Sequence, residues 1–217
     1  MTEKSKKRLL MTSVVTLLPM LIGIVLWNRL PERIATHFDS YGEPNGWSSR
    51  AFAVFGIPLF ICVINAVCAV TTERDPRRSG YPSKMMRLVY WIPAAASWAV
   101  AFGVYSYSLG LKLENTGTYV TVILGILLIV IGNYMPKVKQ NYFLGIKLPW
   151  TYADEDNWNR THRFAGRVWV IGGILLIANW FIGIKNAGIW MVFLIVVLPM
   201  IYSWVYFLKK NKGGNEE

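Results

Sequence analysis

Six apolar runs divide this chain, and they constrain its fold more than any other feature. They cover residues 9–27, 51–71, 88–110, 118–135, 168–184 and 189–208. At 1.5 Å per residue, the first run is about 28 Å long as a helix, enough to cross the hydrocarbon core of a bilayer. The runs predict an all-α membrane protein with six transmembrane helices, the first of them kinked at Pro19.

The composition supports the membrane class. Only 16% of the residues are charged, whereas a soluble domain needs roughly 25% to cover its surface. The net charge of +11 is typical of cytoplasmic loops that are rich in Lys and Arg, so we expect the lipid bilayer as a partner and no direct contact with nucleic acid. Cys62 and Cys68 lie in one apolar run without His or acidic companions, which favours a lipid-facing or packing role.

The basic residues predict the orientation. With six spans, 18 Lys and Arg residues fall on the side of the N-terminus and 5 on the opposite side. By the positive-inside rule, both termini are cytoplasmic. The expected organisation is three transmembrane hairpins: residues 1–71 with an outward loop at 28–50, residues 72–135, and residues 136–217 with a cytoplasmic connector at 136–167.

The connector carries the densest chemistry of the chain. Asp154, Glu155 and Asp156 precede three arginines, so a short amphipathic interfacial helix is predicted at about 152–164, between the fourth and fifth spans. Thr151 followed by Asp154 resembles a capping box at its start. Trp158 and His162 then share one helical face, with Thr161 beside them. This face is either a docking or catalytic surface or a structural one, and spacing alone favours the structural interpretation.

The outward loop is the longest polar segment on the other side. Residues 43–46 (EPNG) form a turn pattern, because Pro fixes φ and Gly allows a positive φ. Ser48 or Ser49 can cap the second span, and Trp47 suits the membrane interface.

Several function classes find no support in the sequence. The six runs contain no Asp, Glu, Lys, Arg or His, which argues against ion-coupled transport. The two histidines, His37 and His162, are predicted on opposite faces of the membrane, so no ligand set for a metal is expected. Phosphate-binding, dinucleotide-binding and nucleophile-elbow motifs are absent, and we predict no cofactor and no catalytic residues.

Two other interpretations stay open at this point. An interfacial membrane hydrolase could use His162 with Asp154 or Glu155 as a base and its orienting partner, although no nucleophile is presented with them. The chain could also be a small-molecule carrier or a cell-envelope stress protein.

The two polar segments resemble the SdpI family of bacterial multi-spanning membrane proteins. The outward loop is similar to a short domain of unknown function that often precedes the family region, and the connector is similar to the family's own motif. The matching residues are Leu30, Pro31, Thr36, His37, Phe38, Gly42, Gly46, Trp47 and Ser48 in the loop, and Gly132, Asn133, Tyr134, Pro136, Lys137, Asn141, Tyr142, Phe143, Gly145, Ile146, Pro149, Trp150, Thr151, Trp158, Thr161, His162 and Gly166 around the connector. Lys147 departs from the motif, where family members often have Arg.

The resemblance implies a non-enzymatic immunity protein of the bacterial plasma membrane. Such a protein protects its host against a secreted, membrane-active peptide toxin, and it can also hold an ArsR-type repressor at the membrane. The implied inner docking residues are Asn141, Phe143, Gly145, Lys147, Trp150, Thr151, Trp158, Thr161 and His162. The implied outer contact residues are Thr36, His37, Phe38, Gly42, Gly46 and Trp47.

Overall fold

The computed structural model describes residues 1–39, 43–111, 116–184 and 186–213. The chain divides into two compact units, each considered by itself. Unit 1 comprises Met1–Arg74 and Ser83–Thr118, and unit 2 comprises Asp75–Pro82 and Tyr119–Glu217. The expected division into three hairpins stays a prediction.

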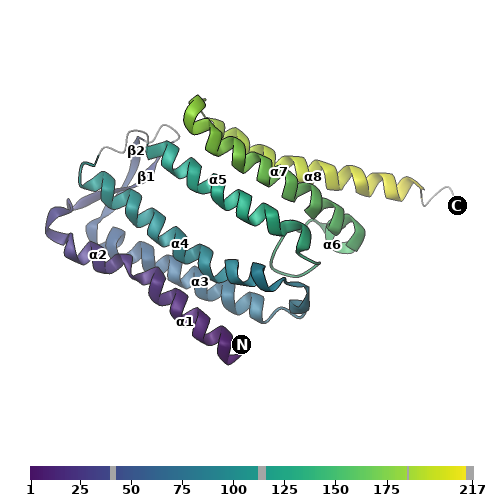
Figure 1. Cartoon of the computed structure of the whole chain (residues 1–217), viewed down its shortest axis with the longest axis horizontal. Helices are drawn as coiled ribbons and strands as arrows, with labels where there is room; N and C mark the ends of the chain where they lie inside the picture. The colour runs from purple at the N-terminus through teal and green to yellow at the C-terminus, as the bar shows by residue number, and fades with distance from the viewer. Residues whose placement is uncertain (40–42, 112–115, 185, 214–217) are drawn as a thin grey trace. The chain divides into compact units, whose positions relative to one another are not determined.

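Unit 1 is a bundle of long helices with a β-hairpin at one end (Figure 1). Its elements are α1 (Glu3–Leu17), α2 (Pro19–Val25), η1 (Trp27–Arg29), β1 (Arg33–Phe38), β2 (Pro44–Ser49), a π-helical turn η2 (Phe52–Gly56), α3 (Ile57–Glu73) and α4 (Ser83–Ser108). The boundary between α1 and α2 falls at Pro19, which confirms the expected kink. Proline causes this break because its nitrogen has no hydrogen to donate.

Hydrogen bonds join the helices of unit 1 at the end opposite the hairpin. The Ser5 hydroxyl at the start of α1 donates to Glu73 at the end of α3 (2.7 Å), and Tyr90 of α4 donates to the same carboxylate oxygen (3.1 Å). Asn65 reaches Thr12 midway along α3 (3.0 Å). These contacts fix α1 antiparallel to α3, and α3 antiparallel to α4, as alternating spans require.

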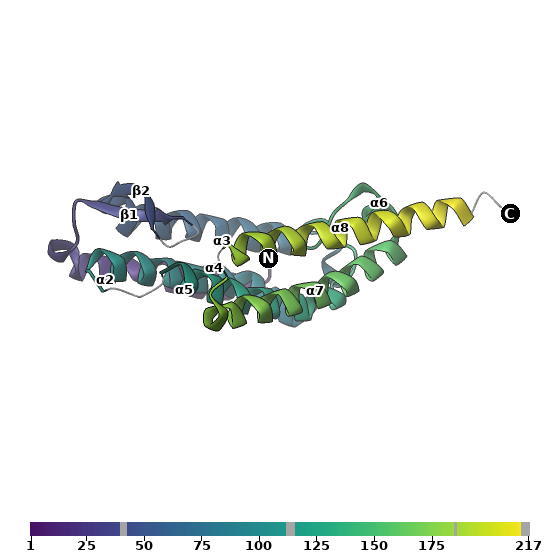
Figure 2. The same ribbon diagram turned by 90° about the horizontal axis from the view of Figure 1, so that it is seen from above.

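Unit 2 contains the remaining helices. They are η3 (Arg78–Gly80), α5 (Thr116–Tyr134), η4 (Met135–Lys137), α6 (Pro149–Ala153), α7 (Glu155–Ile182) and α8 (Ala187–Gly213). Helices α7 and α8 run side by side (Figures 1 and 2). Their core with α5 centres on Leu128, Leu176 and Ile195.

Glycines bring α5 and α7 into backbone contact. A Cβ built on Gly166 would lie 2.7 Å from the Gly132 carbonyl oxygen, and one on Gly173 would lie 2.5 Å from that of Gly125. Within each helix the two glycines are seven residues apart, which is about two helical turns. One face of each helix therefore carries both contacts. Larger side chains at these positions would separate the helices.

Four helices are long and apolar enough to cross a membrane among the described residues: Glu3–Val25, Phe52–Glu73, Ser83–Ser108 and Ala187–Asn211. The fourth predicted span corresponds to a shorter apolar helix, Thr121–Lys137, formed by α5 and η4, and most of the fifth lies in α7. The mostly helical membrane class is confirmed, whereas the count of six and the orientation of the termini stay predictions.

Two local predictions are wrong. The expected short helix at 152–164 is not separate, because α7 begins at Glu155 and continues without a break through the fifth predicted span. No Gly or Pro interrupts the junction except Gly166, which a helix tolerates where it packs against another backbone. The outward loop is also more regular than expected, because Pro44, Asn45 and Gly46 belong to strand β2 rather than to a turn.

Candidate functional site

The first candidate site is the folded connector at the start of α7. Trp158 and His162, one turn apart, are fully buried, and their rings stack with centroids 4.1 Å apart. The Trp158 indole N–H donates to the Val138 carbonyl (2.8 Å). His162 Nε2 accepts the Ile146 N–H (3.0 Å), so Nδ1 carries the ring proton and donates to the Trp158 carbonyl (2.8 Å). The pair therefore holds the loop 138–146 against α7.

The environment of His162 keeps its ring neutral. Burial lowers the pKa of His162 to about 4, although the bond to the Trp158 carbonyl acts in the opposite direction. Gly145 has φ +111°, and a Cβ there would meet His162 Nε2 at 2.3 Å. Only glycine fits this position, by backbone conformation and by space.

Asn141 organises the loop itself. Its side-chain oxygen accepts the N–H groups of Phe143 (2.9 Å) and Leu144 (2.7 Å), and its amide donates to the Lys139 carbonyl (2.8 Å). The Lys147 ammonium then closes the loop by donating to the carbonyls of Tyr142 (3.0 Å) and Phe143 (3.3 Å). The Asn141 side chain thus supplies hydrogen bonds that backbone groups would make to one another in a helix or sheet.

A segment distant in sequence completes the connector. Asp75 is buried, and its carboxylate accepts the Tyr81 hydroxyl and the N–H groups of Arg77 (2.7 Å) and Tyr142 (3.0 Å). Burial raises the pKa of Asp75, but these donors outweigh it and hold that pKa below its usual value. Burial and the neighbouring carboxylate raise the pKa of Tyr81. The Tyr81 oxygen also lies 2.9 Å from Asn141 Oδ1, which links both networks.

Asp75 and Tyr81 were not predicted from the sequence. Asp75 follows Glu73 by two positions at the start of a basic segment, and Tyr81 comes six positions later, which is no recognisable motif. Arg77, from the same segment, donates to Gln140 (2.7 Å) and lies over the rings of Tyr142 and Tyr152.

Helix α8 supports the connector from the other side. The Asn157 amide donates to the Ser203 carbonyl (3.1 Å), and the Trp150 indole N–H donates to the Ser203 hydroxyl (2.9 Å). Thr161 in turn donates to the Asn157 side chain (2.9 Å). The polar face of α7 is therefore buried against α8 and the loop.

The capping prediction for Thr151 is wrong. Asp154 is the residue that caps α7, because its side chain accepts the Asp156 N–H (3.0 Å) and it also pairs with Lys210 of α8 (2.7 Å). Thr151 instead accepts the Leu148 N–H (2.9 Å), one turn earlier, and donates to the Ile146 carbonyl (3.0 Å). Two helices, α6 and α7, begin one after the other in the connector. Thr151 bonds to the backbone at the start of α6, and Asp154 caps α7.

The structure sorts the predicted inner docking residues by exposure. Five have no exposed surface and hold the connector together: Asn141, Thr151, Trp158, Thr161 and His162. Trp150 is half-buried against Trp204. Phe143, Gly145 and Lys147 remain exposed, together with Tyr142. A partner that approaches the connector would therefore meet these four residues.

The geometry does not favour the hydrolase interpretation. Both nitrogens of His162 bond to the backbone, and Asp154 bonds to Asp156 and Lys210 rather than to the imidazole. A general base needs a free nitrogen within reach of a substrate proton. Among the described residues, no three His, Cys, Asp or Glu side chains gather where they could hold a metal ion.

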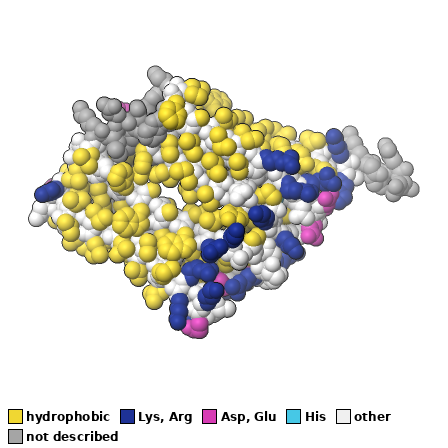
Figure 3. All heavy atoms as spheres, in the orientation of Figure 1, with side chains coloured by type: hydrophobic (Ala, Val, Ile, Leu, Met, Phe, Trp, Pro, Cys, Tyr) yellow, Lys and Arg dark blue, Asp and Glu magenta, His cyan; other side chains and the backbone are white. Residues whose placement is uncertain are grey.

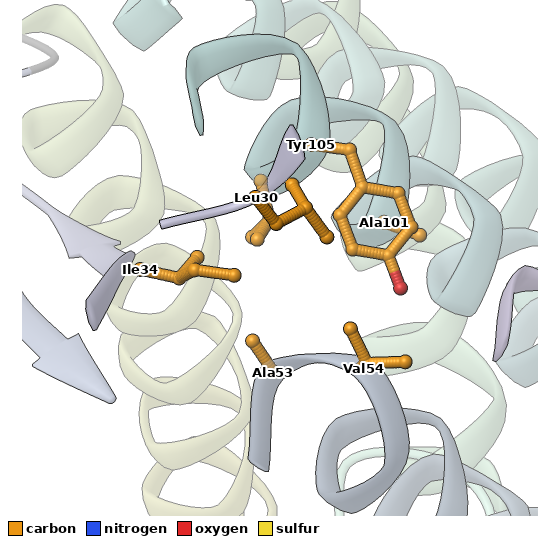
Figure 4. Packing of buried hydrophobic residues seen from close by; sticks show 7 residues of the cluster. Leu30, Ile34, Ala53, Val54, Ala101 and Tyr105 are labelled. Carbon is orange, nitrogen blue, oxygen red and sulfur yellow. The ribbon is translucent and has the colours of Figure 1, made fainter. Parts of the chain in front are cut away.

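The second candidate site is the β-hairpin of unit 1. Strands β1 and β2 are antiparallel, with Ala35 opposite Trp47 and His37 opposite Gly46. The inner side chain Ile34 is fully buried and packs with Leu30 on Ala53 and Val54 of η2 and on Ala101 and Tyr105 of α4 (Figure 4). The hairpin is thus fixed to the helices by its apolar face.

The outer face presents two of the predicted contact residues, Trp47 and His37, whereas Phe38 packs against α4. Trp47 is 50% exposed, His37 is exposed, and the His37 ring bonds to Asn45 across the strands. Thr36 bonds to Ser48 (2.9 Å), and Phe38 packs edge-on against Tyr107. Gly46 is needed because a Cβ there would lie 2.9 Å from that of His37. Gly42 lies outside the described residues.

The end of the hairpin matches one prediction. Ser49 accepts the Phe52 N–H (3.2 Å) as the second span begins, so it is the serine that caps this helix start. Arg50 donates to the Trp27 carbonyl (2.6 Å), which closes the base of the loop.

Comparison with known proteins adds independent evidence. Residues 137–206 match the model of the SdpI/YfhL protein family, and residues 14–62 match a domain of unknown function, DUF1648. The resemblance to the SdpI family is confirmed. The chain is also 26% identical over 212 residues to the immunity protein SdpI of Bacillus subtilis (strain 168), which covers 94% of this chain and 98% of that protein. No solved structure matches it.

The two matched regions correspond to the two candidate sites. The SdpI/YfhL region begins at the end of η4 and ends within α8, so it contains the connector loop, α6 and α7. The DUF1648 region contains the hairpin and its flanking helices. Asp75 and Tyr81 lie outside both regions although they complete the connector.

Proposed function

We propose that this chain is a non-enzymatic immunity protein of the bacterial plasma membrane that protects its host against a secreted, membrane-active peptide toxin. The observation that carries the proposal is the match to an immunity protein along 94% of the chain. The apolar helices and the SdpI/YfhL region support it. The toxin meets the exposed face of the hairpin and the apolar helix surfaces.

The test is survival of a toxin-sensitive host that expresses the full chain. We expect survival at toxin concentrations that kill the host with an empty vector. The control is the Gly145→Leu variant, which should not fold and should not protect. Unchanged killing by the cognate toxin, with folded protein in the membrane, would refute immunity for this chain.

We further propose that the exposed part of the connector holds an ArsR-type repressor at the membrane when toxin is bound. Support comes from Phe143, which is 42% exposed beside the basic side chain of Lys147. Signalling of this kind requires two arrangements of the protein with different affinities for the toxin.

Membrane co-sedimentation of the repressor tests this role. We expect toxin to increase the membrane-bound fraction for the unchanged protein but not for Phe143→Ala. Phe193→Ala is the matched control, because Phe193 is 53% exposed on α8 away from the connector. Equal co-sedimentation with all three proteins would exclude Phe143 from the docking surface.

A further inference from the structure

One face of α7 changes from basic to apolar along a single line of residues. Arg163, Arg167, Ile171, Ile174, Ala178 and Phe181 follow one another at spacings of three and four, so they lie on one side of the helix. Both arginines are exposed, as are Ile171 (58%), Ile174 (53%) and Phe181 (86%). Such an apolar surface on a membrane helix is covered by acyl chains.

The other faces of α7 are occupied by protein. Gly166 and Gly173 face α5, whereas Asn157 and Trp169 bond to α8. The line of Arg163 and Arg167 lies between these contacts. The arginines therefore stand at the depth where the lipid-facing surface changes from hydrocarbon to headgroup, about 6 Å apart along the helix axis.

The charges of the two arginines are not balanced by carboxylates of the described residues. Two of the three acidic residues at the start of α7 are engaged elsewhere: Asp156 pairs with Arg160 (2.9 Å) and Asp154 with Lys210 (2.7 Å). No ion pair within the described part of the chain includes Arg163 or Arg167. On the face shown in Figure 3, Lys and Arg side chains of unit 2 gather toward the end that carries α6.

We propose that Arg163 and Arg167 bind the phosphate of an anionic phospholipid whose acyl chains lie along Ile171, Ile174 and Phe181. Guanidinium groups suit this ligand because each presents two parallel N–H donors to phosphate oxygens. One bound lipid thereby fixes the depth of α7, and with it the depth of the connector. This inference does not depend on the proposed immunity function.

Native mass spectrometry of the full-length protein tests the proposal. The detergent-purified protein is mixed with equal amounts of phosphatidylglycerol and phosphatidylcholine, and the bound lipids are counted. We expect a preference for phosphatidylglycerol that falls about 30-fold in the Arg163→Gln/Arg167→Gln variant, since each basic residue near an anionic surface contributes about fivefold. Arg160→Gln is the matched control, because Arg160 is committed to Asp156 and its loss should leave the preference nearly unchanged.

Two more measurements keep the test decisive. The Arg163→Lys/Arg167→Lys variant preserves charge and fold and should keep part of the preference. Inorganic phosphate at millimolar concentration should not displace the lipid, because it has no acyl chains to cover the apolar line. Equal lipid preference in the unchanged protein and the double Gln variant, an equal loss in Arg160→Gln, or displacement by inorganic phosphate would overturn the proposal.

Discussion

The hairpin and the connector are both polar insertions between apolar helices, yet they use their motif residues in opposite ways. In the hairpin, backbone pairing and one apolar face provide the structure, so Trp47 and His37 remain available at the surface. In the connector no strand pairs the backbone, so Asn141, Trp158 and His162 are buried to satisfy it. Motif residues that are buried to satisfy the backbone are therefore not available for the proposed recognition, whereas those of the hairpin are.

The largest expected effect comes from Gly145→Leu in the connector. The new side chain would need φ +111° and would overlap the His162 ring, so we expect no folded protein by size-exclusion chromatography in detergent. Gly183→Ala is the matched control. Gly183 also has a positive φ (+72°) but nothing lies within 4 Å of its Cβ position, so this substitution should cost only about 1 kcal/mol. Equal recovery of both variants would contradict the packing described for the loop.

The next largest difference in stability is expected between substitutions of Trp158 in the connector and Trp47 in the hairpin. Trp158→Ala removes a fully buried ring and its bond to Val138, which should lower the free energy of unfolding by about 3–5 kcal/mol. Trp47→Ala removes a ring that is half exposed and should change the free energy of unfolding by no more than about 0.5 kcal/mol. Thermal unfolding in detergent measures both, and similar losses would show that the comparison is wrong.

Acid should weaken the connector through His162. Its pKa is about 4 in the folded protein, against an ordinary value of 6.5. The unfolded chain therefore binds the proton more readily, and stability is complete above about pH 6.5 and falls as the pH approaches 4. The loss should reach about 3 kcal/mol at pH 4, measured as unfolding temperature against pH.

A matched histidine variant isolates this effect. His37→Gln removes the other histidine, which is exposed in the hairpin, and should leave the acid-dependent loss unchanged. His162→Gln should reduce the slope between pH 6.5 and 4. If His37→Gln rather than His162→Gln reduced this slope, the acid sensitivity would lie in the hairpin, and the prediction for the connector would be wrong.

Tyr81→Phe should have the smallest of these effects. It removes the hydroxyl donor from the buried Asp75 carboxylate while the Arg77 and Tyr142 N–H groups remain. We expect a loss of about 1–3 kcal/mol in the free energy of unfolding. Tyr142→Phe provides the control, because the Tyr142 side chain is 45% exposed and its loss should change stability by less than about 0.5 kcal/mol.

Apolar patterning was enough to predict the helices but not the polar segments. The kink at Pro19 and the stacking face of Trp158 and His162 follow from local rules of proline and helical spacing, and the structure confirms both. The prediction of a separate helix at 152–164 is wrong because charge periodicity marks where a helix begins but not whether it continues into an apolar run. The strands were missed because their pairing depends on contacts between two segments, which the pattern of either segment alone does not specify.

The division of labour within the candidate sites could not be predicted. Spacing placed Trp158 and His162 on one face but could not show that a loop covers that face. Asp75 and Tyr81 contact connector residues that are 67 and 60 positions away, and a single sequence contains no local pattern for such contacts. Exposure, which separates Phe143 and Lys147 from their buried neighbours, is a property of the folded chain.

Survival per folded molecule tests the central claim most directly. Host cells expressing Trp47→Ala or Trp158→Phe are challenged with toxin, and survival is divided by the amount of folded protein in the membrane. The account predicts that Trp47→Ala reduces this ratio at an unchanged protein level, whereas Trp158→Phe lowers the protein level and leaves the ratio intact. A reduced ratio for Trp158→Phe together with an unchanged ratio for Trp47→Ala would contradict it.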